Sequence, residues 1–235
     1  MRAAPSVELA SIIGRTLYLL LDFDGPICSV FAGLPAPSVA ARLRELLGSN
    51  GKPLPGTVAG EDDPIEVLRF TSHFDLDTAA RVEAALRDAE QAATATATPT
   101  PDAREVILAC QQTGRRVAII SNNSQAAVET YLRAHHLAEQ VDVVVARTDP
   151  DPRLLKPHPH LVLQALDALG GDPATSSFVG DSASDVQSAK AAGIHSVGYA
   201  NKAGKVERLQ RAGADVIVTT MGELRDALLT NQPSS

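Results

Sequence analysis

The stretch "LLLDFDGPIC", residues 19–28, places two carboxylates directly after a run of apolar residues. The continuous apolar character of residues 17–23 is typical of a strand that is buried on both faces of a sheet. Alternate residues of an extended chain point to the same side, so Asp22 and Asp24 are expected to face together and Phe23 to face away. Gly25 permits a sharp turn after the strand. Acids at a strand end are also common turn residues, so the rest of the chain must show whether this pair has a chemical role or only forms a turn.

Composition restricts the classes of protein to consider. The chain has 235 residues, of which 44% are hydrophobic, enough for one large domain or a core with a smaller module. A net charge of -7, 3% aromatic residues and no Trp argue against a nucleic-acid partner. No apolar run approaches the roughly 20 residues of a membrane span, so we expect no membrane partner. Cys28 and Cys110 fit free thiols of a reducing compartment, which favours a cytoplasmic localisation.

Further apolar runs rich in β-branched residues predict more buried strands. They lie at residues 116–121, 141–146, 177–180, 194–200 and 214–219. Amphipathic or Ala-rich helical patterns separate them, at residues 125–135, 158–169, 182–192 and 221–229. Gly170 follows the second of these at the position where a helix commonly ends. Strands that alternate with helices predict an α/β fold with a doubly wound, mostly parallel sheet.

Residues 27–100 interrupt this alternation. No buried strand is predicted there, and helical patterns begin instead at Pro37, Asp63 and Asp77. The loop at residues 48–63 separates the first two patterns, and "TATATPTP", residues 94–101, is typical of a low-complexity linker. We therefore predict a catalytic core of residues 1–26 and 101–235, with a helical cap and its linkers at residues 27–100.

Two other predicted strands end in residues that can carry chemistry, and a lysine lies just before a predicted helix. In "IISNNS" the Ser121 hydroxyl and the amide N–H groups of the turn formed with Asn122 and Asn123 can hold phosphate oxygens, although Ser121 could simply cap the helix that follows. In "KPHPH" Lys156 can neutralise phosphoryl charge, although most lysines are on the surface. In "GDSASD" Asp181 and Asp185 are expected to share one face of a first helical turn, although this could be a capped helix alone.

Parallel strands would bring these segments to one edge of the sheet. Four carboxylates would then meet there, from Asp22, Asp24, Asp181 and Asp185. Such a cluster is destabilising without a hard cation, and oxygen ligands with room for water and phosphate suit Mg²⁺.

The order and spacing of "DFDGP", "SNN", "KPHP" and "GDSASD" resemble the four motifs of the haloacid dehalogenase-like superfamily. Within that superfamily the chain resembles the phosphatase branch of the phosphoglycolate phosphatase type, with a helical cap. The resemblance implies a Rossmann-like sheet and Mg²⁺-dependent hydrolysis of a small phosphomonoester through an aspartyl-phosphate. One departure is Pro26, where many members have Thr or Val, because Pro offers neither hydroxyl nor N–H to a phosphate.

The resemblance also implies roles for single residues. Asp22 would attack phosphorus, and Asp24 would protonate the leaving alcohol and later activate water. Ser121 and Lys156 would contact the transferring phosphoryl group. Gly25 would join them in binding the substrate.

For the metal, the resemblance implies ligands from Asp22, from the backbone carbonyl of Asp24 and from Asp181. Asp185 would bind the ion directly or through water. Asn122 would add a contact to the substrate.

Two other functions stay open at this stage. A phosphosugar mutase on the same scaffold would need a cap group that returns the phosphoryl group, for which His73 is a candidate. A non-catalytic binding protein on the same fold is the other. The sequence does not identify the phosphomonoester, the cap residues that select it, or the oligomeric state.

Overall fold

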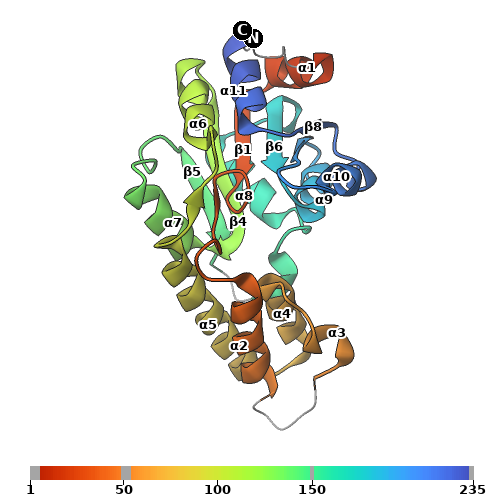
Figure 1. Ribbon diagram of the computed structural model, residues 1–235. Coiled ribbons are helices and arrows are strands. Elements are labelled where there is room, and N and C mark those ends of the chain that lie inside the picture. The colour runs from red at the N-terminus through yellow and green to blue at the C-terminus, as the bar shows by residue number, and fades with distance from the viewer. Residues whose placement is uncertain (1–5, 49–53, 149–150, 233–235) are drawn as a thin grey trace.

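A parallel sheet forms the centre of the molecule (Figure 1). The computed structural model describes residues 6–48, 54–148 and 151–232. Within these ranges the sheet has six strands, in the order β5-β4-β1-β6-β7-β8, and every neighbouring pair is parallel. The strands are β1 (Tyr18–Asp22), β4 (Arg116–Ser124), β5 (Val143–Arg147), β6 (Ser176–Gly180), β7 (His195–Tyr199) and β8 (Val216–Val218). The predicted α/β fold with a doubly wound parallel sheet is confirmed.

The order of the strands places β1 at a special position. The chain adds β4 and β5 on one side of β1 and then returns to add β6, β7 and β8 on the other side. In such sheets ligands bind beyond the carboxyl end of the strand at which this direction reverses. That end of β1 is Asp22.

Helices cover both faces of the sheet, and alternate side chains of β1 reach both layers. Leu19 and Leu21 are buried in the cluster made with α1, α6, α7 and α11, and Leu20 is buried in the cluster made with α8 and α9. The first layer comprises α1 (Val7–Arg15), α6 (Ala103–Gln112), α7 (Gln125–Ala134) and α11 (Met221–Thr230). The second comprises α8 (His160–Leu169), α9 (Ala183–Ala191) and α10 (Lys205–Ala212). Continuous apolar strands are therefore explained by burial on both sides.

The end of one helix and the starts of two short turns illustrate how the sequence sets local structure. Gly170 follows α8 with φ of 63°, as the sequence predicts for the end of that helix. Short 3-10 turns, η2 (Pro152–Leu154) and η3 (Pro173–Thr175), begin at prolines after Asp caps.

None of the described helices is both long and apolar enough to cross a bilayer.

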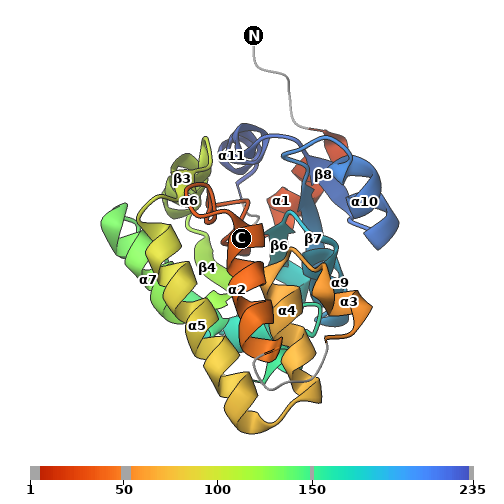
Figure 2. The same ribbon diagram turned by 60° about the horizontal axis from the view of Figure 1, so that its bottom comes forward.

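A cluster of helices lies at the opposite end of the molecule from α1 and α11, and Figure 2 brings it forward. We call it the helical insert: α2 (Ala36–Gly48), α3 (Gly56–Ala59), α4 (Pro64–Phe70), η1 (Thr71–His73) and α5 (Leu76–Thr94). It has its own hydrophobic cluster, in which Leu43, Leu68 and Leu86 from three helices are buried. The three predicted helices are confirmed. The predicted loop at 48–63 contains α3 in addition, and its residues 49–53 lie outside the described ranges.

The described part of residues 27–100 contains no fully buried strand, as predicted, but it does contain a short strand pair that the sequence does not predict. The chain enters and leaves the insert through an antiparallel pair, β2 (Cys28–Ser29) and β3 (Thr98–Pro99). Each strand is too short to show a periodic pattern, and the residues of β3 are exposed, so the Thr/Pro-rich segment resembles a linker. The division of the chain at residues 26 and 101 stays a prediction.

Candidate active site

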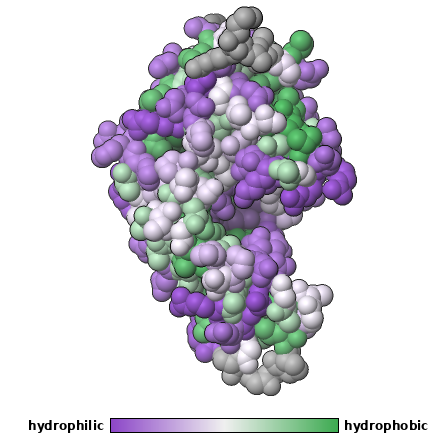
Figure 3. Space-filling model, in the orientation of Figure 1, coloured by the Kyte–Doolittle hydropathy of each residue, from purple (hydrophilic) through white to green (hydrophobic). Residues whose placement is uncertain are grey.

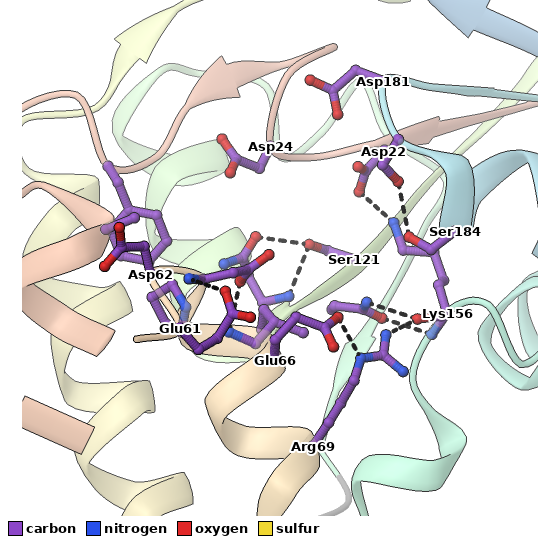
Figure 4. A pocket seen from close by; sticks show the side chains of 18 residues that line it. Asp22, Asp24, Glu61, Asp62, Glu66, Arg69, Ser121, Lys156, Asp181 and Ser184 are labelled. Atoms are coloured by element: carbon purple, nitrogen blue, oxygen red, sulfur yellow. Dashed lines mark hydrogen bonds and ion pairs between the residues drawn. The ribbon is translucent and has the colours of Figure 1, made fainter. Parts of the chain in front are cut away.

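A cavity of about 540 Å³ lies between the carboxyl edge of the sheet and the helical insert. The space-filling view shows a hollow at this level with hydrophilic side chains (Figure 3). Figure 4 shows Asp22, Asp24 and Asp181 on the core side. On the insert side it shows Glu61, Asp62, Glu66 and Arg69. Ser121, Asn122 and Lys156 complete the core wall of the cavity.

Asp22 ends β1 and its carboxylate is held from two directions. Its Oδ1 accepts the Phe23 N–H at 2.8 Å and the Lys156 Nζ at 2.6 Å. Burial raises the pKa of Asp22, Asp185 raises it further, and Lys156 opposes both. Phe23 faces away, buried edge-on against Tyr131. Asp22 and Asp24 thus both line the cavity, as the alternation of the strand predicts.

Lys156 is buried, and the alternative of a surface lysine is wrong. Its side chain is 2% exposed, and Nζ lies 2.6 Å from Asp22 Oδ1 and 2.7 Å from Asp185 Oδ1. Burial lowers the pKa of this ammonium, but the two carboxylates outweigh burial, so the pKa is raised above the ordinary value. A buried cation thus lies between two buried acids.

The side chain of Asn122 holds the backbone of Lys156. Its Oδ1 accepts the Lys156 N–H at 2.9 Å, and its Nδ2 donates to the Lys156 carbonyl at 3.3 Å. Arg69 of the insert donates to the same carbonyl. Asn122 lines the cavity, but both polar atoms of its side-chain amide already bond to the backbone of Lys156. Its contact with a substrate stays a prediction.

Asp24 and Gly25 form the turn that follows β1. Asp24 Oδ1 accepts the Val30 N–H at 3.0 Å. Burial raises the pKa of Asp24 to about 6 despite this bond. Gly25 has φ of 110°, and a Cβ there would lie 2.4 Å from Asp181 Cγ. Only glycine therefore fits this turn while Asp181 keeps its place.

The N–H of Gly25 is engaged within the turn. It donates to the Cys28 carbonyl at 2.7 Å, and the Gly25 carbonyl accepts the Thr100 hydroxyl at 2.5 Å. The role of Gly25 as a direct substrate contact stays a prediction.

Asp181 and Asp185 are placed differently from the prediction. They do not share a helical turn, because Ser182 takes the N-cap position of α9 and leaves Asp181 in the non-helical segment before it. Asp185 completes a capping box, in which its Oδ2 accepts the Ser182 N–H at 3.0 Å. Asp181 Oδ2 accepts from Lys205 and, at 3.4 Å, from Asn201 Nδ2. Neither of these two partners was predicted from the sequence.

Ser121 is fully buried beside the cavity. Its hydroxyl donates to Asn123 Oδ1 at 3.1 Å, and the Asn123 N–H donates to Ser121 Oγ at 3.0 Å. β4 continues to Ser124, with a shift of register against β5 between Ser121 and Ser124. The alternative that Ser121 caps the next helix is wrong, because Ser124 occupies the N-cap position of α7.

Three of the four predicted metal ligands come together. Carboxylate oxygens of Asp22, Asp181 and Asp185 all lie within 4.8 Å of one another. The predicted ligand from Asp24 is its backbone carbonyl, and that role stays a prediction. An all-oxygen donor set with a net negative charge is the chemistry that a hard divalent cation prefers, so these residues fit such an ion.

A family model described as haloacid dehalogenase-like hydrolase matches residues 62–199, a range that includes Ser121, Lys156, Asp181 and Asp185. The chain belongs to the haloacid dehalogenase-like hydrolases. Solved structures of such hydrolases and of phosphatases share its fold. It superposes on a predicted phosphatase from Clostridium acetobutylicum with a TM-score of 0.71, at 19% identity, over 92% of this chain and 99% of the other. CbbY from Rhodobacter sphaeroides, solved in complex with phosphate, gives a TM-score of 0.65 at 21% identity over 89% and 96% of the two chains.

Curated relatives of this haloacid dehalogenase-like hydrolase include phosphoglycolate phosphatases. That of Escherichia coli K12 is 32% identical over 128 residues, 54% of this chain and 50% of the relative. That of Salmonella paratyphi A is 31% identical over 128 residues, again 54% and 50%. The chain thus matches about half the length of these relatives.

The insert side of this hydrolase's cavity carries charges that sequence reasoning did not assign. Four acids line it, with Arg69 as the cation of the described lining on that side. The acids are Glu61, Asp62, Asp63 and Glu66. Arg69 Nε lies 2.9 Å from Glu66 Oε1, so its charge is already paired. The sequence "GEDD" contains three of these acids, but their position beside the cavity depends on the packing of the insert against the core and is not visible in the sequence.

Proposed function

We propose that this haloacid dehalogenase-like hydrolase is a Mg²⁺-dependent phosphatase that hydrolyses a small phosphomonoester through an aspartyl-phosphate on Asp22. The observation that carries the proposal is the buried Lys156 Nζ, 2.6 Å from Asp22 Oδ1, in a cavity that Ser121 and Asp181 also line. The curated relatives named phosphoglycolate phosphatase and the phosphate complex of CbbY support phosphoryl chemistry.

In the first half-reaction a carboxylate oxygen of Asp22 bonds to phosphorus and the bond from phosphorus to the alcohol oxygen breaks. Oδ1 already accepts hydrogen bonds from Phe23 and Lys156, so we propose Oδ2 as the attacking atom. The leaving oxygen takes a proton from Asp24. A pKa of about 6 supports this role, because a carboxyl group so raised can both carry and release a proton near neutrality.

In the second half-reaction water attacks the aspartyl-phosphate. Asp24, now ionised, takes a proton from that water, and the water oxygen bonds to phosphorus. The bond between phosphorus and the Asp22 oxygen breaks, which releases inorganic phosphate and restores the Asp22 carboxylate.

Charge on the phosphoryl oxygens is offset from several sides. Lys156 supplies a fixed cation, and the Ser121 hydroxyl can exchange Asn123 for a phosphoryl oxygen by rotating about its Cβ–Oγ bond. Mg²⁺ would be held by Asp22, Asp181 and the Asp24 carbonyl, with Asp185 bound directly or through water. When bound, the ion would neutralise charge that spreads over the equatorial oxygens.

The charges of the insert favour one class of phosphomonoester. The alcohol part of the substrate would face Glu61, Asp62, Asp63 and Glu66, and the nearby Arg69 is paired. A carboxylate on the alcohol part of the substrate would be repelled by these acids, whereas an ammonium group would be attracted. We therefore propose a neutral or cationic alcohol, such as an amino alcohol, as the leaving group.

The structure offers little to the mutase alternative. His73, its candidate group, is exposed, stacks on Phe70 at 5.0 Å between ring centroids and hydrogen-bonds to Ser72. It is not among the residues that line the cavity.

Phosphate release from a panel of phosphomonoesters, with Mg²⁺ or with EDTA, tests the proposal. We expect turnover that needs Mg²⁺ and that Asp22→Asn abolishes, while Asp167→Asn, on the exposed side of α8, keeps it. Isomerised sugar phosphate without free phosphate would favour the mutase. Absence of both products across the panel would favour a non-catalytic protein.

A further inference from the structure

Glu90 connects the helical insert to the core. It lies near the C-terminal end of α5, which runs beside α7 of the core (Figure 1), and it is 0% exposed. Its Oε2 accepts the Ser124 N–H at 2.8 Å and Arg147 Nη2 at 2.5 Å. Its Oε1 accepts Asn123 Nδ2 at 3.2 Å. All of these donors belong to β4 and β5, so a carboxylate of the insert is bound entirely by the core.

Asn123 carries this contact to Ser121. Because Asn123 Nδ2 donates to Glu90, the Oδ1 of the same amide faces Ser121 and accepts its hydroxyl proton at 3.1 Å. The Asn123 N–H donates back to Ser121 Oγ at 3.0 Å. Glu90 therefore fixes Asn123, whose N–H keeps the Ser121 oxygen in place even when the hydroxyl proton turns from Asn123 to a phosphoryl oxygen.

Arg147 balances the charge of the buried Glu90 carboxylate and also binds the backbone of β4 at Asn122. Its side chain is 1% exposed, and it pairs with Glu90 and with Glu83. Its Nε donates to the Asn122 carbonyl at 3.0 Å. A guanidinium between two carboxylates supplies the counter-charge that burial of Glu90 requires.

We propose that Glu90 is a positioning residue, which acts through Asn123 to orient Ser121 and so couples the placement of α5 to the phosphoryl site. This inference rests on the proposed function, in which Ser121 contacts the transferring phosphoryl group. Glu90 is neither among the residues that line the cavity nor part of the cluster of Asp22, Asp181 and Asp185. It works by presenting two acceptor oxygens to three donors of the core.

Glu90→Gln is the direct test. Glutamine keeps the shape but replaces one acceptor oxygen by an NH₂ group, so at least one of the three donors faces another donor. We expect kcat to fall roughly 10–100-fold, the range of supporting hydrogen-bond partners, with KM changed about twofold or less.

Glu83→Gln is the matched control. Glu83 shares Arg147 with Glu90 and also pairs with Arg87 at 3.2 Å, but it contacts neither Asn123 nor Ser124. We expect its kcat to stay within about threefold of the parent protein, because the change leaves the bonds of Glu90 to Asn123 and Ser124 in place. Equal losses of kcat in the two variants would overturn the proposal.

The Ser121→Ala background separates positioning from general stability. There Glu90→Gln should lower kcat by less than about twofold further, because the group that it orients is gone. A full loss in that background would also overturn the proposal. If Glu90→Gln does not fold, Asn123→Ala replaces it, because this change cuts the connection but keeps the bonds of Glu90 to Ser124 and Arg147. An inactive parent protein with every phosphomonoester and Mg²⁺ would instead refute the proposed function, and the inference with it.

Discussion

Replacement of Lys156 by methionine removes the buried cation between Asp22 and Asp185. The side chain is 2% exposed and lies 2.6 and 2.7 Å from the two carboxylates. Loss of one partner of a buried ion pair costs about 3–5 kcal/mol, because the remaining charge stays buried without a counter-charge. For a chain of this size 1 kcal/mol corresponds to about 2–4 °C, so we expect the Tm without Mg²⁺ to fall by about 6–20 °C.

The same change should affect catalysis and the response to the ion. Loss of one fixed charge at the phosphoryl group is expected to lower kcat by about 10²–10³-fold. Mg²⁺ should raise the Tm of Lys156→Met more than that of the parent protein, since the ion supplies charge that the lysine no longer provides.

Differential scanning calorimetry and steady-state kinetics measure these effects. Lys190→Met, at an exposed position of α9, is the control and should change the free energy of unfolding by less than about 0.5 kcal/mol. A Tm of Lys156→Met within about 2 °C of the parent protein, together with an unchanged kcat, would refute the reasoning.

Three further predictions concern the turn, the thiols and the substrate. Gly25→Ala places a Cβ 2.4 Å from Asp181 Cγ at φ of 110°, so it should lower the Tm by about 2–12 °C and weaken Mg²⁺-dependent turnover. Gly56→Ala is the control, because a Cβ there meets open space, and it should change neither the Tm nor the turnover. Equal Tm values for the two variants would contradict this prediction. Cys28 and Cys110 are buried, and burial raises the pKa of both thiols, that of Cys110 to about 12. Neither thiol should therefore react with a thiol reagent at about pH 8 until the chain is unfolded. Rapid labelling of either cysteine in the folded protein would contradict this prediction. The kcat/KM for an amino-alcohol phosphate should exceed that for a carboxylate-bearing phosphomonoester of similar size by roughly tenfold, and Asp62→Asn should narrow the ratio; a preference for the carboxylate would contradict the assignment of charge.

Much of the core could be predicted because its signals are local. Buried parallel strands are continuous apolar runs, so β1 and β4–β8 were found within a few residues of their ends. Parallel strands share a carboxyl edge, so the sequence predicts that Asp22, Ser121 and Asp181 converge there, with Lys156 beside them. The structure places these side chains around one cavity.

The rest depends on contacts between segments that are remote in the sequence. Glu90 meets Ser124 and Arg147 only because α5 packs beside the carboxyl ends of β4 and β5. The same holds for the pair of Lys205 with Asp181. No pattern of spacing marks these residues. β2 and β3 were missed because two-residue strands have no period.

The central claim is that Asp22 accepts the phosphoryl group, and chemical trapping tests it most directly. During turnover with Mg²⁺, borohydride should reduce an acyl phosphate on Asp22 to homoserine, which peptide mass spectrometry would locate at residue 22 and which EDTA or Asp22→Asn would prevent. Steady release of phosphate with no modification at Asp22, or with the modification on a different carboxylate, would contradict the account.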